Sequence, residues 1–347
     1  MGKMCAAEGW RFTKQVVEGR WFSVFASFVI MIGAGSPYLF GTYSKVIKTQ
    51  FDYSQTQVNT LGFSKDLGSN LGVFAGLLAE VAPPWPQRGE DFTILQALLS
   101  KDMALIFLAT VCACGSSIAA IDNLGQIAES LSYPAQSISV FVSWISIFNF
   151  FGRVFSGFIS ETLMTKYKLP RPLMFALAHL LTCIGILFIA FPYHGSVYVA
   201  SLIIGFGFGA QVPLLFAIIS DLFGLKHYST LLNCGQLAVP LGSYVLNVLL
   251  IGRMYDMEAT RTGNTKNGKG LTCSGAHCFN GSFTILATIT LFGAISSLAL
   301  AYRTRGFYKG AIYQRYRDDM WITQSDMELY SSNTMKNNEF KKNTEYR

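Results

Sequence analysis

The sequence has little charge and little of the chemistry that enzymes use. Of its 347 residues, 14% are charged and four are histidines. It contains no Gly-x-Ser-x-Gly nucleophile elbow, no His-Glu-x-x-His zinc helix, no Walker phosphate loop and no Cys-x-x-Cys pair. We therefore expect no enzyme activity, no catalytic residues, no cofactor and no bound metal.

Hydrophobic residues are abundant instead, at 51% of the chain. A bilayer core of about 30 Å needs about 20 mostly apolar residues in a helix, and backbone in lipid must satisfy its own hydrogen bonds. The sequence therefore predicts an all-α membrane protein with about eight transmembrane helices. The predicted spans are Trp21–Tyr43, Leu61–Ala82, Met103–Ile121, Ser137–Ser160, Leu173–Phe191, Val197–Ser220, Thr230–Ile251 and Phe283–Tyr302.

The net charge of +7 could indicate a nucleic-acid partner, but its distribution follows the predicted topology. With a cytoplasmic N-terminus, 19 of the 27 Lys and Arg residues fall on the cytoplasmic side, 6 fall on the opposite side, and Lys65 and Arg153 lie within helices. This bias fits the positive-inside rule with both termini cytoplasmic. We expect the lipid bilayer as a partner and no nucleic acid.

A short pattern, Gly-x-(Leu/Ile)-x-Glu, occurs at the ends of two apolar runs, as Gly76–Glu80 and Gly157–Glu161. Such internal repetition is typical of transporters built from related halves. Arg153 precedes Gly157 by one turn and Glu161 by two turns, so it could bridge helix ends by charge-assisted hydrogen bonds. We assign Glu80, Arg153, Gly157 and Glu161 a gating or structural role.

Polar residues within the predicted spans are the candidates for a solute path. Asp122, Asn123 and Gln126 end the third span and could face a cavity, although an interfacial helix end explains them as well. Lys65 and Asp66, on the second span, need interior or interfacial partners because unpaired charge in lipid is costly.

Other polar positions belong to the later spans. Gln211 precedes Pro213, which predicts a helix broken near mid-membrane with the amide facing the interior. Asn233 and Gln236 are three residues apart and share a helical face. Asn149 lies on the fourth span.

The loop Gly252–Asn280 is the longest predicted non-cytoplasmic segment and contains Cys273 and Cys278. On an extracellular or lumenal side these cysteines could form a disulfide. A zinc site with His277 has suitable spacing but too few ligands.

Several stretches together resemble the major facilitator superfamily, and more narrowly the plant nodulin-like, or nuclear-fusion-defective-like, family. The stretches that carry the resemblance are Arg20-Trp21-Phe22, Gly33–Tyr43, Lys65–Gly68, Pro83-Pro84-Trp85, Gly89–Ala97, Ala120–Gln126, Gly152-Arg153 and Ser220–Gly224. Each piece alone is weak, but the combination is specific and covers residues from about Arg20 to Asp318.

The resemblance implies a twelve-helix carrier of two six-helix bundles, with a solute bound between them and alternating access by rocking. This chain departs from that plan, because four helices of the N-terminal bundle are absent between the second span and the central loop. The expected fold is therefore a truncated major facilitator bundle. The expected divisions are 1–20, a cytoplasmic N-terminus; 21–82, the first two transmembrane helices; 83–102, a cytoplasmic loop; 103–302, a six-helix C-terminal bundle; and 303–347, a cytoplasmic tail.

By this resemblance the expected function is transport of a small solute. The expected substrate-binding residues are Tyr38, Asp122, Asn123, Gln126, Asn149, Gln211, Asn233 and Gln236. A cavity between two bundles needs both walls, so the alternative is a non-transporting isoform that acts as a membrane interaction or regulatory protein. Self-association or pairing with a full-length relative would supply the missing wall.

Overall fold

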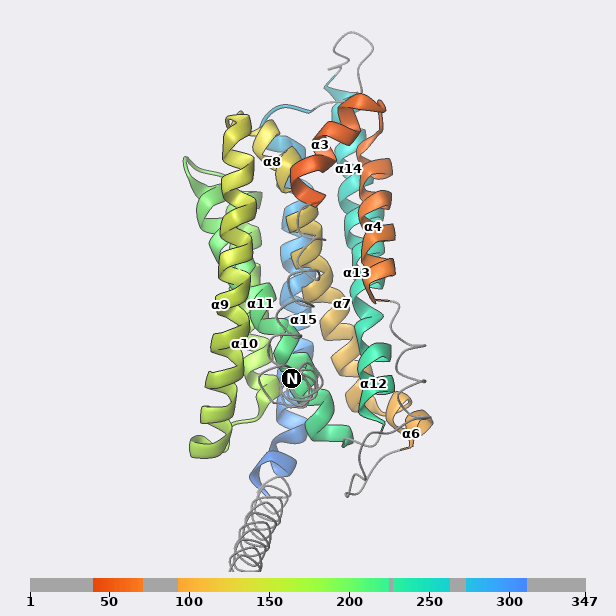
Figure 1. The fold of residues 1–347 in the computed structure, drawn as a ribbon, viewed down its shortest axis with the longest axis vertical. Helices are drawn as coiled ribbons and strands as arrows, with labels where there is room; N and C mark the ends of the chain where they lie inside the picture. Colours follow the sequence, from red (N-terminus) through yellow and green to blue (C-terminus); the bar gives the residue numbers. More distant parts are fainter. Residues whose placement is uncertain (1–39, 71–92, 225–226, 263–272, 311–347) are drawn as a thin grey trace, which may run out of the picture.

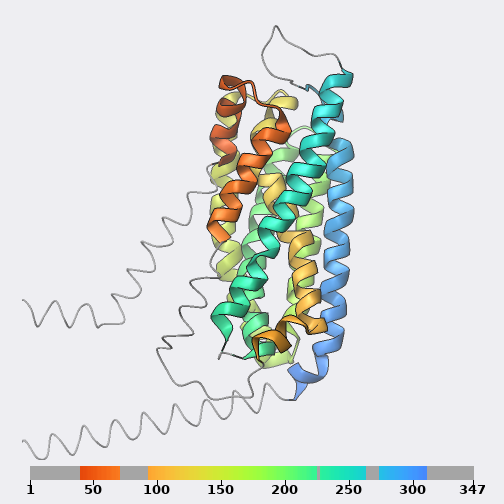
Figure 2. The same cartoon turned by 90° about the vertical axis from the view of Figure 1, so that its right-hand side faces the viewer.

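The structure, a computed structural model, describes residues 40–70, 93–224, 227–262 and 273–310. Figures 1 and 2 show the described helices side by side in one elongated bundle. Within these residues, six helical segments are long and apolar enough to cross a membrane. The prediction of an all-helical, multi-pass membrane fold is confirmed for this part of the chain.

The six segments run alternately up and down the bundle (Figure 1). They are α7 (Lys101–Asp122), α9 (Ala135–Tyr167), α10 (Arg171–Ala190), α11 (Ser196–Phe223), a composite segment from Tyr228 to Arg261, and α15 (His277–Lys309). Shorter helices are α3 (Phe40–Gln50), α4 (Gln55–Asn70), α6 (Ile94–Leu98) and α8 (Leu124–Ser130). We name the two ends of the bundle the Asp122 end and the Lys101 end, after the two ends of α7.

Local sequence explains several helix ends. Ser100 caps α7, because its hydroxyl accepts a hydrogen bond from the Met103 amide at 3.0 Å. Lys168 ends α9 in the left-handed conformation, and Gly224 ends α11 with a positive φ of 82°. These stops lie in short polar connections, as the hydropathy pattern predicts.

Small residues let α9 and α11 approach closely. A Cβ on Gly205 would lie 2.8 Å from the Ile145 carbonyl oxygen, and one on Gly209 would overlap the backbone of Asn149. Close helix contact through glycine is a typical arrangement in membrane bundles. The glycine-rich run Gly205–Gly209 therefore serves helix packing.

The prediction of a break beside Gln211 is wrong. Helix α11 continues through Pro213 without interruption. The irregular span is the composite one, which consists of α12 (Tyr228–Gln236), α13 (Ala238–Gly242), η2 (Ser243–Gly252, a π-helix) and α14 (Arg253–Arg261). Pro240 lacks a backbone N–H and crowds the preceding turn, which explains why the regular helix stops here.

Other boundaries also differ from the predictions. Residues Arg253–Arg261, expected in a loop, form α14, and α15 continues past Tyr302 to Lys309. Helix α4 begins at Gln55, before the start of the predicted span Leu61–Ala82. Threonine hydroxyls in these segments donate to backbone carbonyls one turn earlier, as Thr60 and Thr260 do. Polar residues therefore continue these helices, and polarity alone does not predict where the helices end. Most of the first predicted span and residues 71–82 of the second lie outside the described residues.

Helices α3 and α4 lie at the Asp122 end (Figures 1 and 2). Helix α4 runs beside the composite span and packs mainly on η2, while α3 contacts α8. These two helices come from the N-terminal part of the chain, and as far as the structure describes them they lie against one end of the six-helix bundle.

The contact between α9 and α11 predicts a sharp difference between two glycines. Gly209→Ala should lower the melting temperature of the purified protein in detergent, because overpacking typically costs about 1–3 kcal/mol. Gly157→Ala, on the same pair of helices, meets no atom within 4 Å and should be neutral or slightly stabilising. Equal melting temperatures for the two variants would contradict this packing.

Candidate functional site

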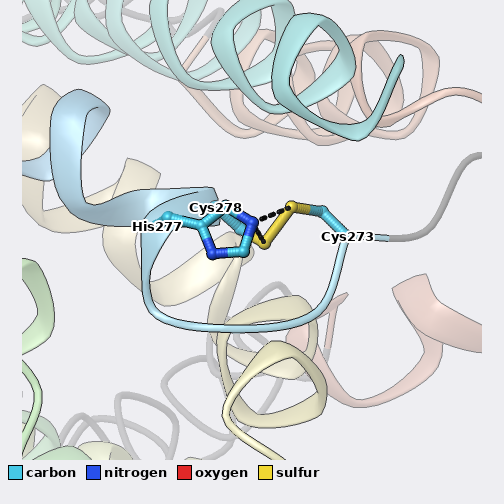
Figure 3. A group of neighbouring side chains, drawn as sticks. All are labelled: Cys273, His277 and Cys278. Carbon is cyan, nitrogen blue, oxygen red and sulfur yellow. Dashed lines mark hydrogen bonds between the residues drawn. A yellow bond between two sulfur atoms is a disulfide. The ribbon is translucent and has the colours of Figure 1, made fainter. Parts of the chain in front are cut away.

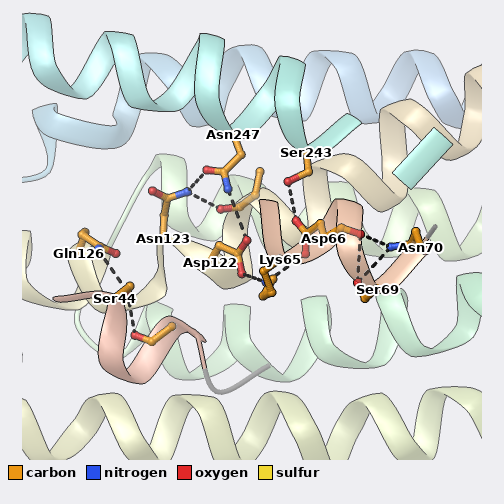
Figure 4. A network of polar contacts seen from close by, with 12 residues as sticks. Ser44, Lys65, Asp66, Ser69, Asn70, Asp122, Asn123, Gln126, Ser243 and Asn247 are labelled. Carbon is orange, nitrogen blue, oxygen red and sulfur yellow. Dashed lines mark hydrogen bonds and ion pairs between the residues drawn. The ribbon is translucent and has the colours of Figure 1, made fainter. Parts of the chain in front are cut away.

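One lysine and two aspartates form a buried ionic group where α4 meets α7. The Lys65 ammonium lies 2.8 Å from Oδ1 of Asp122 and 3.0 Å from Oδ1 of Asp66 (Figure 4). The side chains of Lys65, Asp66 and Asp122 are 19%, 5% and 2% exposed. Charged groups at such depth persist only with partners, and here the partners come from two different helices.

The π-helix η2 adds two polar side chains to this group. Ser243 donates a hydrogen bond to Oδ2 of Asp66 at 2.6 Å, and Asn123 donates from its side-chain amide to Oδ1 of Asn247 at 2.6 Å (Figure 4). Ser243 and Asn247 are buried. A stretch of π-helix rotates side chains relative to the regular helix and is frequent at functional sites.

Amides of α4 extend the connection toward the Asp122 end. Gln55 donates from one amide nitrogen to Asn59 at 3.0 Å and to Asn123 at 2.8 Å. Asn59 in turn donates to the backbone carbonyl of Asn247 at 2.8 Å. We call the connected set the interface network: it consists of Gln55, Asn59, Lys65, Asp66, Asp122, Asn123, Ser243 and Asn247.

Asp256 of α14 caps the N-terminus of α4. Its carboxylate accepts hydrogen bonds from the backbone N–H groups of Gln55 and Thr56, at 2.8 and 3.0 Å, and from the Thr56 hydroxyl at 2.6 Å. A carboxylate at this position satisfies free amides and complements the helix dipole. The cap comes from about 200 residues away in the sequence, so it ties the N-terminal helices to the C-terminal bundle.

Lys48, on α3 outside the six candidate spans, lies close to this cap. Its ammonium donates to Gln55 at 2.9 Å and lies 4.3 Å from the ring centroid of Tyr255. Burial lowers the pKa of Lys48 to about 8, although the carboxylates of Asp256 and Glu129 act in the opposite direction. Lys48 therefore adds a third attachment of the N-terminal helices at the Asp122 end.

The structure brings together some of the residues proposed from sequence. Asp122 and Asn123 belong to the interface network, and Gln126 lies beside it, donating to the Ser44 hydroxyl at 3.3 Å (Figure 4). The Oε1 atom of Gln126 is buried without a hydrogen-bond partner among the described residues.

The other proposed residues lie elsewhere. Gln211 is fully buried between α7 and α10, where it donates to Thr182 at 2.9 Å and faces Ser117. Asn149 accepts from Arg153 on its own helix, and Asn233 donates to the Ser229 carbonyl one turn earlier. Gln236 ends α12 and is half-buried. Tyr38 lies outside the described residues.

A second ionic group lies at the Lys101 end and involves Glu161. Arg171, at the start of α10, pairs with Glu161 of α9 and, at 3.2 Å, with Asp221 of α11. Tyr308 of α15 donates to Asp221 at 3.0 Å. Four helices are thus joined at this end. Arg153 donates to Asn149, one turn earlier on its own helix, and Gly157 faces open space. Glu80 lies outside the described residues.

Cys273 and Cys278 form a disulfide with an S–S distance of 2.01 Å (Figure 3). Nε2 of His277 lies 3.8 and 3.9 Å from the two sulfurs. Zinc binds cysteine as thiolate, and here the sulfurs are bonded to each other. The backbone N–H of Cys273 donates to the Tyr255 hydroxyl, which holds Cys273 against the composite span.

Two protein-family models match the sequence. A model described as "Nodulin-like" matches residues 20–87, and a model described as "NFD4, C-terminal domain" matches residues 93–310. The second match covers more than half of the chain. The chain belongs to the nodulin-like/NFD4 family. The resemblance drawn from the sequence motifs is confirmed.

The chain matches two curated relatives, and in each case the match covers only part of the relative's length. "Protein NUCLEAR FUSION DEFECTIVE 4" of Arabidopsis thaliana is 26% identical over 243 residues, which is 70% of this chain and 40% of that protein. "Probable transporter MCH1" of Yarrowia lipolytica (strain CLIB 122 / E 150) is 26% identical over 215 residues, 59% of this chain and 43% of that protein. The chain thus spans less than half of either relative, which is consistent with the expected truncation.

Sequence reasoning missed several members of the interface network. Ser243 and Asn247 lie in an apolar run, which predicts a membrane span but no site at these two positions. Gln55 and Asn59 lie between the first two predicted spans. An amide inside a membrane span is a usable signal, because it needs a partner, and Asn247 could have been found on that ground. Nothing in the sequence indicates that Asp256 would cap a helix at the other end of the chain.

The cap predicts a local effect of Asp256. Asp256→Ala should speed hydrogen exchange at the amides of Gln55 and Thr56, because both lose their acceptor, and should cost about 0.5–2 kcal/mol. Glu258→Ala, which removes a carboxylate two positions further along the same helix, is the matched control. Unchanged exchange at residues 55–56 in Asp256→Ala would show that the cap does not hold α4.

Proposed function

We propose that this membrane protein moves a small solute across the bilayer by alternating access. The observation that supports the proposal best is the interface network. It places buried ionic and amide groups between the N-terminal helix α4 and two elements of the six-helix bundle, α7 and η2. Intramembrane ionisable residues at the boundary between two helix groups are typical of solute and ion pathways.

The chemical groups of the interface network would allow α4 to move away from the six-helix bundle. Beside an aromatic contact between Phe63 and Tyr244, the links between α4 and the bundle are hydrogen bonds and ion pairs that involve polar side chains. Such groups can exchange partners for water or for a polar solute, whereas an interdigitated apolar contact would have to expose hydrocarbon. In this account, the structure represents the state closed at the Asp122 end.

Asp122 and Asn123 are the residues we assign to solute binding first, with Gln126 beside them. A buried carboxylate and adjacent amides favour a solute that donates hydrogen bonds. Asn149, Gln211, Asn233, Gln236 and Tyr38 remain proposed contacts of the solute. Glu161, with its partner Arg171, is assigned to the opposite gate at the Lys101 end, together with Arg153, Gly157 and Glu80.

The charge distribution supports an orientation with both termini in the cytoplasm. The Asp122 end, which carries the disulfide, would then face the extracellular or lumenal side, where disulfides persist.

A non-transporting interaction protein is the second candidate, and one surface favours it. Along α9, Phe150, Phe155 and Phe158 are 60%, 50% and 75% exposed. Helix α9 is also the least buried of the six candidate spans, and the chain covers less than half of its curated relatives. A further copy or a longer relative could cover this face and complete the second wall.

Transport can be tested without knowing the solute. The purified chain, reconstituted in liposomes, should accumulate at least one compound from a mixture of labelled low-molecular-weight metabolites, detected by mass spectrometry against empty liposomes. Asn247→Leu should reduce that uptake about tenfold or more, because it removes the side-chain acceptor of the buried Asn123 amide and the amide that faces Asp122.

Ile295→Val, on the exposed surface of α15, is the control and should transport normally. If the folded chain takes up nothing at any protein density, while the same liposomes containing a longer relative are active, the interaction-protein alternative is favoured.

A further inference from the structure

The ionic group of the interface network is not balanced in charge. Lys65 supplies one ammonium, while Asp66 and Asp122 supply two carboxylates, and all three lie within one group of contacts. The group therefore carries one excess negative charge when all three are ionised. An uncompensated charge in a membrane interior is unfavourable, so binding one positive charge here would be favourable.

The two carboxylates differ in how well they are solvated by the protein. Asp66 contacts the Lys65 ammonium through Oδ1 and accepts a short hydrogen bond from Ser243 on Oδ2, at 2.6 Å. Asp122 contacts Lys65 through Oδ1, but among the described residues the hydrogen bond to its Oδ2 is a long one, of 3.5 Å, from the Asn247 amide. Hydrogen bonds to the ionised form stabilise it, so Asp122 is the carboxylate that gains more from neutralisation.

The described neighbours of this ionic group come from α4, η2 and α3, and the charged ones are few. Helix α4 presents Lys65 and Asp66, and η2 presents the uncharged Asn247 and Ser243. Helix α3 presents the Phe40 ring, which lies 5.0 Å from the Lys65 ammonium. Asn123 follows Asp122 directly and is also uncharged. Among the described residues, the ionisable groups of this site are thus one lysine and two aspartates.

A proton fits this site better than a metal ion. The ammonium of Lys65 already occupies the position between the two carboxylates where a sodium ion would bind, and a second cation there would be repelled at close range. A proton needs no such space, because it bonds to one oxygen and removes the charge. The open Oδ2 of Asp122 is the oxygen that can accept it.

We propose that Asp122 is a proton-binding site that controls the contact between α4 and α7. This inference rests on the proposed transport function, to which it adds proton coupling. A proton from the aqueous phase adds to Oδ2 of Asp122, Lys65 keeps its own three protons, and the ionic part of the Lys65–Asp122 bond is lost. Lys65 then remains paired with Asp66 on its own helix, so α4 loses its ion pair with α7.

The test uses the full chain in lipid nanodiscs and needs no solute. Infrared difference spectra between neutral and acidic solution report the C=O stretch of each carboxylic acid that forms. The wild-type chain should show a band that Asp122→Asn removes and that Asp66→Asn keeps. A band that persists in folded Asp122→Asn would overturn the proposal.

Lys65→Met and Asp66→Asn test the same assignment if Asp122→Asn does not fold. Lys65→Met removes the counter-charge, so the band should appear in less acidic solution, by about 1–3 pH units. Asp66→Asn removes the competing negative charge, so the band should need more acidic solution. Shifts in the same direction, or none, would contradict the assignment. The spectrum does not depend on flux. A chain that shows the band but no uptake would overturn the transport function alone, and a chain that shows uptake but no band would overturn the proton site alone.

Discussion

The structure depends on one buried ion pair, between Lys65 of α4 and Asp122 at the end of α7. In a membrane interior neither charge is stable alone, and breaking such a pair by removing one partner costs about 3–5 kcal/mol. The pair therefore fixes where the N-terminal helices lie. The π-helix of the composite span, which begins just after Pro240, presents Ser243 and Asn247 to this group. Asp256 and Lys48 each contact Gln55, at the start of α4. The polar contacts of α4 with its surroundings therefore lie between Gln55 and Asp66.

This arrangement separates two tasks within the bundle. Glycine contacts between α9 and α11, and the Arg171 ionic group at the Lys101 end, hold the six-helix bundle together. The interface network instead joins that bundle to helices from the N-terminal region. Packed glycine backbones have few alternative arrangements, whereas hydrogen-bonded amides and ion pairs can exchange partners. A movement of α4 relative to the bundle would therefore require changes chiefly in the network.

Much of the fold could be predicted from sequence, because membrane spans are specified by length and hydropathy alone. The six C-terminal spans and the polar end of α7 followed from that reasoning. The composite span did not, because the effect of Pro240 on the helix depends on the neighbours that accept the freed backbone groups. Gln211 illustrates the opposite error: Pro213 predicted a break, but the packed bundle keeps α11 continuous. The network itself joins residues nearly 200 positions apart, such as Asn59 and Asn247, and local patterns carry no information on such pairs.

The most direct test of the account is the distance between α4 and α9 at the Asp122 end. Thr60 and Val140 are both exposed. Spin labels at these two positions would report the distance by pulsed electron paramagnetic resonance in nanodiscs. The account predicts two distance populations, one matching this structure and a longer one with α4 separated. Asp122→Asn should enrich the longer population. A single narrow distribution, unchanged by that substitution and by acidification, would contradict the claim that the network is a contact that opens.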